Sequence, residues 1–122
     1  MTLKRIRLEL ARDPDFPEGS RSHGYEFVAP LDPEGRLLPA EWRAERGHCR
    51  VTRFWAGEAS QHGRLMHRPG GSWVFDYDPD RSDDDEVGFK LGNHRFAPGE
   101  YVSFTEQDEA LRCFRVASVQ AL

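Results

Sequence analysis

Along most of this chain, apolar and polar residues alternate with a period of two, the pattern of a strand with one buried face. In residues 4–10, the apolar side chains of Ile6, Leu8 and Leu10 share one face, and the residues between them are all charged. A hairpin around Gly92-Asn93 is expected within residues 87–96. The other strand-like segments are residues 23–31, 49–55, 64–68, 72–78, 101–106 and 110–119.

One segment departs from this pattern. Residues 39–46 carry helix signals, because Pro39 suits the first helical position and Gly47 suits the position just past the end. Turn signals separate the strand-like segments, including DPEG at 32–35 and APGE at 97–100. Short strands, tight turns and one short helix predict a mainly β fold, a small antiparallel β-barrel or rolled sheet of about 7–8 strands.

Length and composition fit one soluble unit. The chain has 122 residues, and we expect residues 1–122 to form a single β-rich domain. Eight Phe, three Trp and three Tyr can fill a core, while a mean hydropathy of −0.73 favours a soluble protein. No signal peptide or membrane-spanning stretch is recognisable. The two cysteines form no CxxC pair, so we expect reduced thiols in a cytoplasmic protein without membrane contact.

Negative charge is concentrated in DYDPDRSDDDEVGF at residues 76–89. This stretch holds seven carboxylates and one arginine, a net charge of −6, whereas the whole chain carries −4. Residues 78–86 are therefore expected to form an acidic surface loop. Because the chain is acidic, with a pI near 5.7, nucleic-acid binding is not expected.

Three interpretations of the acidic loop stay open. It can dock a protein partner by steering charge, it can bind a divalent cation, or it can be a solvated connection that discourages sheet pairing. The EF-hand template fails because its glycine and bidentate glutamate positions hold other residues, so no metal ligands are assigned. The residues expected to contact a partner are Asp80, Asp83, Asp84, Asp85 and Glu86.

A second hypothesis concerns the aromatic strands in the middle of the chain. His67 alternates with Leu65, so it is expected to point inward beside Arg53 of the neighbouring strand. An inward His and Arg among aromatic rings suit an anion or a small molecule. The alternative is that both residues lie at a barrel rim in water. The residues of this expected pocket are Arg53, Trp55, His67 and Trp73.

Motifs for catalysis are missing from the sequence. There is no G-x-S-x-G elbow, phosphate-binding loop or dinucleotide glycine fingerprint. His62 and His67 are five residues apart, which puts them on opposite faces of a continuous strand and disfavours a zinc site. No catalytic residue, metal or cofactor is assigned. The sequence therefore favours a binding or interaction module over an enzyme, with an unknown protein partner or a small molecule as its ligand. A small enzyme with a pocket near Arg53 and His67 is the alternative. Oligomeric state is left open.

Three stretches resemble a family of small uncharacterised bacterial β-rich proteins. They are SHGYEF at 22–27, PGGSWVFDYDPDRSDDDE at 69–86 and PGEYVSF at 98–104. The resemblance spans most of the chain and implies a β-rich fold. It implies no activity and no catalytic residue.

Overall fold

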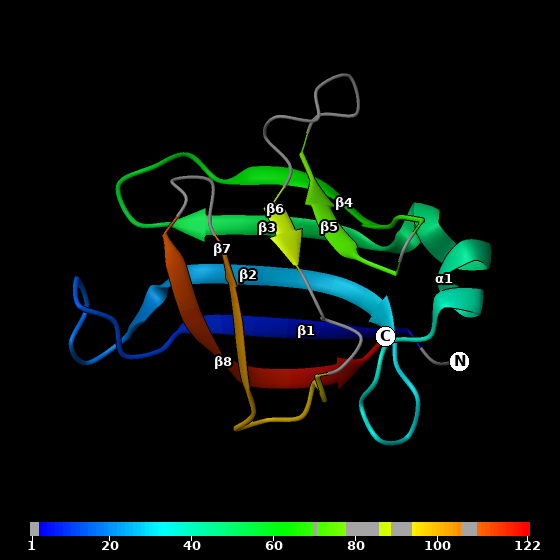
Figure 1. Ribbon diagram of the computed structural model, residues 1–122, viewed down its shortest axis with the longest axis horizontal. Helices are drawn as coiled ribbons and strands as arrows, with labels where there is room; N and C mark the ends of the chain where they lie inside the picture. The colour runs from blue at the N-terminus through cyan, green and yellow to red at the C-terminus, as the bar shows by residue number, and fades with distance from the viewer. Residues whose placement is uncertain (1–2, 70, 78–85, 89–93, 106–109) are drawn as a thin grey trace.

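An antiparallel sheet of eight strands dominates the described part of the protein (Figure 1). The computed structural model describes residues 3–69, 71–77, 86–88, 94–105 and 110–122, with the backbone alone for residues 86–88 and Phe104. An α-helix, α1 (Pro39–Glu45), leads into a 3-10 turn at Arg46–His48. The strands are β1 (Leu3–Leu10), β2 (Ser20–Pro30), β3 (Arg50–Trp55), β4 (Gln61–His67), β5 (Trp73–Asp76), β6 (Glu86–Gly88), β7 (Tyr101–Thr105) and β8 (Leu111–Ala121).

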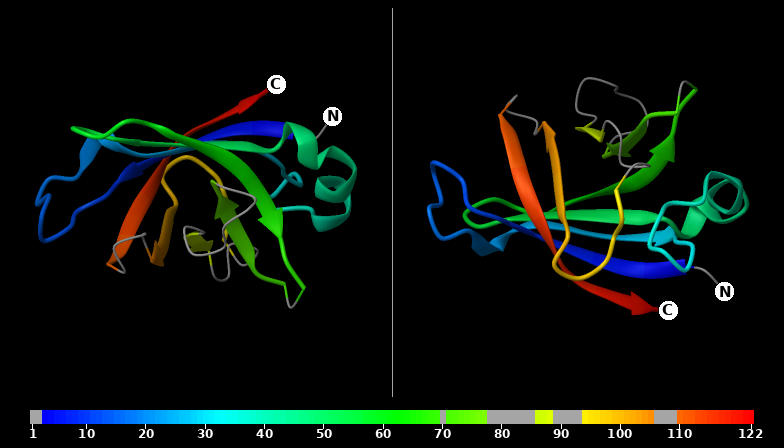
Figure 2. Two further views of the ribbon diagram at one scale, coloured as in Figure 1. Left: turned by 90° about the horizontal axis from the view of Figure 1, so that it is seen from above. Right: turned by 60° about the horizontal axis from the view of Figure 1, so that its bottom comes forward.

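The sheet is a curled half-barrel. Its strand order is β6-β5-β4-β3-β2-β1-β8-β7, so the long last strand returns to lie beside the first. The curl, visible in Figure 2, brings the edge strands β6 and β7 near each other, although the described residues form no hydrogen-bonded ladder between them. The predicted mainly β fold, a rolled antiparallel sheet with one short helix, is confirmed.

Aromatic rings fill the concave face of the sheet. Alternation along the strands sends one set of side chains inward, and most of these are buried. The ring centroids of Tyr25 and Phe75 lie 5.2 Å apart, and those of Phe27 and Phe75 lie 5.4 Å apart. Phe114 of β8 closes the group at 5.3 Å from Tyr25. Among the described residues, these rings occupy the interior of the curled sheet.

The helix docks through a single tryptophan. Trp42 is 3% exposed, and its indole Nε1 donates a 2.8 Å hydrogen bond to the carbonyl oxygen of Leu65 on β4. Its ring meets Trp73 edge-on at 5.9 Å. A helix this short is not stable alone, so these contacts hold it in place.

The hairpin predicted over residues 87–96 is wrong at its last residues. Residues 94–96 are not a strand, and Gly92-Asn93 lies outside the described residues. The Phe96 amide instead donates to the Gly35 carbonyl at 2.8 Å, and the ring packs edge-on against Phe27 at 5.6 Å. Burial of this ring in the core outweighs a local strand pairing. The predicted turns at 32–35 and 97–100 are confirmed by hydrogen bonds closing each of them.

Gly24 marks the tightest contact between strands. It lies between Glu9 of β1 and Phe54 of β3, next to an irregularity in the register of β1 and β2. A Cβ atom at this position would lie 1.9 Å from the carbonyl oxygen of Leu8. Glycine is therefore required here, because the contacted atom belongs to the backbone of β1, which is paired with a strand on each side.

We expect Gly24→Ala to lower the free energy of unfolding by more than about 3 kcal/mol, because a methyl group cannot fit without moving β1. Denaturant titration measures the change. Gly47→Ala is the control, since nothing lies within 4 Å of its added Cβ, and it should change stability by less than about 1 kcal/mol. A Gly24→Ala protein as stable as wild type would contradict this packing.

Candidate functional site

The structure does not bring together the four residues expected to form one pocket. Arg53 is paired with Gln61 in the register of β3 and β4, and His67 lies six residues further along β4. At the rise of a strand, this places the two side chains about 20 Å apart. Of the contacts expected in the pocket, Arg53 contacts Trp55 and His67 contacts Trp73. The expected pocket is thus two separate contacts at opposite ends of the strands.

His67 belongs to the docking surface of the helix. Its ring lies 4.4 Å from that of Trp73 and 5.9 Å from that of Trp42. The side chain is half-buried. These contacts give His67 a packing role between the sheet and α1.

Arg53 and Trp55 belong to a group that we call the end cluster: Asp13, Phe16, His23, Arg53, Trp55 and Arg112. The Arg53 guanidinium lies 4.4 Å above the Trp55 ring, and that of Arg112 lies 5.7 Å from it. Both arginines are at most 9% exposed. Sequence reasoning missed Arg112 and His23 because they come from strands far from β3 in the chain.

The two arginines of the end cluster form ion pairs with carboxylates. Arg112 donates to Asp13 at 2.8 Å and to Asp15 at 3.3 Å, and Arg53 donates to Glu58 at 3.3 Å. Two arginines thus meet three carboxylates, which leaves no surplus positive charge for an anion among these residues. Because the pair Asp13–Arg112 joins segments 99 positions apart, the cluster ties the loop after β1 to β8 and closes this end of the half-barrel.

The His23 ring packs against two aromatic rings of this cluster. It lies 4.4 Å from Phe16 and 4.6 Å from Trp55, and Nδ1 lies 2.6 Å from the Ser20 hydroxyl. Burial lowers the pKa of His23, and the positive charges of Arg53 and Arg112 lower this pKa further. The Ser20 hydroxyl also accepts the Ser22 amide at 3.1 Å, so it stabilises the local turn.

The acidic loop lies largely outside the described residues. Residues 78–85 are not described, and Glu86 is described only as backbone in β6. Its role in docking a partner or binding a cation stays a prediction. Within the described residues, no group of three or more His, Cys, Asp or Glu side chains could hold a metal ion. Within the same residues, no helix is long and apolar enough to cross a membrane.

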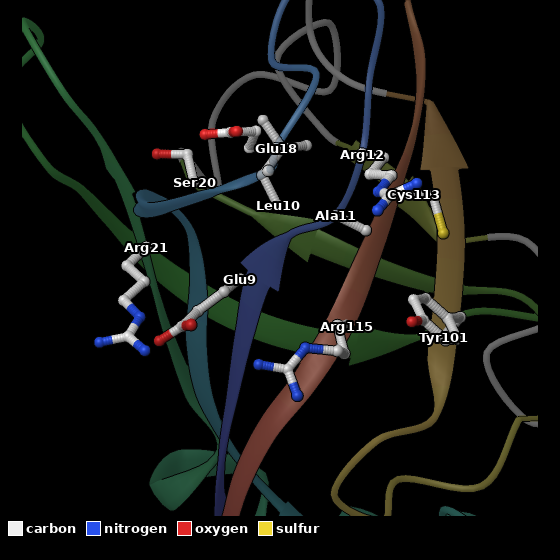
Figure 3. A pocket seen from close by; sticks show the side chains of 11 residues that line it. Glu9, Leu10, Ala11, Arg12, Glu18, Ser20, Arg21, Tyr101, Cys113 and Arg115 are labelled. Carbon is white, nitrogen blue, oxygen red and sulfur yellow. The ribbon is translucent and has the colours of Figure 1, made fainter.

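A pocket of about 620 Å³ lies on the convex face, where β1, β7 and β8 meet the loop after β1 (Figure 3). We call it the basic pocket. Cross-strand pairing builds its floor, because Arg115 of β8 lies opposite both Glu9 and Tyr101. The polar residues that line it are Glu9, Arg12, Glu18, Ser20, Arg21, Tyr101, Cys113 and Arg115.

Positive charge is in excess in the basic pocket. Figure 3 shows the guanidinium groups of Arg12, Arg21 and Arg115 around it, and all three residues are exposed. The carboxylate of Glu9 is bound by Arg7 at 2.8 Å. Across the described ranges, the guanidinium groups of Arg12, Arg21 and Arg115 have no carboxylate within ion-pairing distance. The arrangement is suited to hold an anion.

The two thiols occupy different surroundings. Cys49 is fully buried, and burial, together with the charge of Glu45, raises its pKa to about 11. Cys113 is half-buried and lines the basic pocket. Both cysteines are free, as the sequence predicted.

The basic pocket was not predicted from the sequence. Its lining residues come from positions 9–12, 18–21, 101 and 113–115, and no motif connects these segments. The available signal was the alternation of β8, which places Cys113 and Arg115 on the polar face. Nothing local indicated that Arg12 and Arg21 would join them.

No family model matches this chain, and no match is found among curated proteins or solved structures. The site therefore has to be interpreted from its own geometry.

We expect stability to fall on acidification because of His23. Its pKa in the folded protein lies below the ordinary value of 6.5, so the unfolded chain binds the proton first as the pH falls. The contribution of neutral His23 to the free energy of unfolding is complete above pH 6.5. It is lost as the pH falls from 6.5 to the lower pKa that His23 has in the folded protein. Urea titrations at about pH 7.5 and about pH 5.5 measure the loss.

His23→Gln should show a smaller loss of stability over this pH range than wild type. The same pH dependence in His23→Gln and wild type would refute the assignment.

We also expect the thiols to differ in reactivity. In the folded protein at about pH 8, iodoacetamide should modify Cys113 and spare Cys49, since a buried thiol of raised pKa supplies almost no thiolate. Mass spectrometry of peptides identifies the modified cysteine. Both thiols should react in denaturant, and rapid modification of Cys49 in the folded protein would contradict its burial.

Proposed function

We propose that the protein is a binding module that recognises a small molecule bearing phosphate or carboxylate groups in the basic pocket. The observation that carries the proposal is the group of three exposed guanidiniums, without carboxylate partners among the described residues, around a pocket of about 620 Å³. A volume of this size is within the range of small-molecule sites.

The chemistry of the lining favours an oxyanion. Guanidinium groups bind phosphate or carboxylate through paired N–H donors, and such charge-assisted hydrogen bonds are about twice as strong as neutral ones. The exposed Tyr101 provides a further hydroxyl donor on the β7 side. Glu18 offers an acceptor for a hydroxyl or amino group elsewhere on the ligand.

Binding is favoured over catalysis by what surrounds the pocket. Its thiol, Cys113, has no histidine beside it among the residues that line the pocket. The hydroxyl of the serine at its edge, Ser20, accepts the Ser22 amide and so stabilises the local turn. We also infer a cytoplasmic location, because both cysteines are free thiols.

Removal of one guanidinium should weaken anion binding. We expect Arg115→Ala to raise the Kd for inorganic phosphate, pyrophosphate or citrate by about 10- to 100-fold, the loss of one or two charge-assisted hydrogen bonds. Isothermal titration calorimetry measures the Kd. Arg43→Ala is the matched control, since it removes the same charge from an exposed position on α1 and should leave the Kd nearly unchanged.

The thiol of Cys113 provides a second readout of the same site. Saturating pyrophosphate should slow alkylation of Cys113 in wild type, and it should have little effect on this rate in Arg115→Ala. An equal loss of affinity in Arg115→Ala and Arg43→Ala would show that net charge, rather than the basic pocket, governs binding. No binding of any of the three anions to wild type would overturn the proposal.

A further inference from the structure

A second basic feature lies on the convex face, across the sheet from the basic pocket. Arg50 of β3 is directly opposite Arg64 of β4, and both side chains are exposed. Like charges in such cross-strand positions repel each other, because their Cβ atoms are only about 5 Å apart. The fold itself gains nothing from this pair.

The carboxylates near Arg50 and Arg64 form ion pairs with other arginines. Glu26, two strands from Arg64, lies 3.7 Å from Arg5 and 3.4 Å from Arg7. Asp76, opposite Arg64 on β5, lies 4.0 Å from Arg68. Among the residues that the structure describes, neither Arg50 nor Arg64 has a carboxylate within ion-pairing distance.

Beside this pair lies a pocket of about 450 Å³, which we call the β4–β5 pocket. It forms where the pairing of β5 with β4 ends at Asp76, while β4 extends on to Gln61. The backbone that leaves β5 presses against Gly63, whose Cβ would lie 2.2 Å from the Asp76 carbonyl oxygen. This close approach builds one wall of the pocket.

The β4–β5 pocket combines charge with apolar surface. The half-buried side chains of Met66 and Tyr77 line it, and both pack against the core. His62 also lines it, and its Nδ1 is engaged with the Thr52 hydroxyl at 3.2 Å. Nε2 is therefore the ring nitrogen left for a ligand.

We propose that the β4–β5 pocket binds a small carboxylic acid with an aliphatic or aromatic body. The carboxylate bridges the guanidiniums of Arg50 and Arg64 and relieves their repulsion. The apolar body of the ligand packs against Met66 and Tyr77. The lining of the basic pocket is more highly charged and offers less apolar surface for such a contact. The two pockets share no lining residue, so this inference stands whether or not the basic pocket binds phosphate.

Benzoate and octanoate are the probes, with acetate as a carboxylate lacking an apolar body. In ¹⁵N-edited spectra of the whole protein, benzoate or octanoate should shift amide signals of residues 50–52, 62–66 and 76–77 at concentrations below about 10 mM. Acetate should need at least about a tenfold higher concentration to produce the same shifts, because it contacts the arginines but has no apolar body to pack against Met66 and Tyr77.

Arg64→Gln should raise the Kd of benzoate by about tenfold or more, without unfolding the protein, because Arg64 is exposed. Its Tm without ligand should stay close to that of wild type, because Arg64 lies opposite both Arg50 and Asp76 and the two charge effects oppose each other. Met66→Ala should weaken octanoate but not acetate, and Arg115→Ala should leave both unchanged.

Three results would overturn the proposal. They are the absence of shifts at residues 50–52 and 62–66 with either probe, equal Kd values for acetate and benzoate, or an equal loss of benzoate binding in Arg64→Gln and Arg115→Ala. The last result would indicate attraction by net charge. Failure of phosphate to bind the basic pocket affects only the proposed function, because these measurements follow different residues.

Discussion

Packing of aromatic rings inside the curled sheet is the interaction on which the rest of the structure depends. Tyr25, Phe27, Phe75 and Phe114 come from three strands that are separated widely in the chain, and they meet only because the sheet bends around them. Burial of rings of this size is the main favourable term in such a core. The same packing fills the concave face among the described residues, and the basic pocket and the β4–β5 pocket both lie on the convex face.

Arginine has different roles at the ends and on the convex face, and burial decides which. Arg53 and Arg112 are buried, so each meets a carboxylate and the Trp55 ring, because an unpaired charge would be costly there. Arg50 and Arg115 are exposed and need no partner for the fold. Exposed guanidiniums beside surface pockets that have no carboxylate partner among the described residues are thus more informative about binding than the buried ones.

Ion pairs lie between the basic pocket and the β4–β5 pocket on the convex face. Arg7 lies 2.8 Å from Glu9 and 3.4 Å from Glu26, which links β1 to β2 in the middle of the sheet. The basic pocket lies on the β8 side of this link, and the β4–β5 pocket lies on the other side. Both pockets carry arginines, and the β4–β5 pocket adds the side chains of Met66 and Tyr77, so the two pockets suit different acids.

Most strands, the short helix, the turns at 32–35 and 97–100, and the faces on which side chains such as Arg115 lie could be predicted from the sequence, whereas the strand expected at residues 94–96 is not formed. These features follow from local alternation and turn chemistry, which a single segment carries. The tertiary structure decided which distant segments meet: it separated His67 from Arg53, buried Phe96 in the core, set Arg50 opposite Arg64, and gathered Arg12 and Arg21 around Arg115. Register and loop closure between remote strands depend on the packing of the whole core, and no local pattern encodes them.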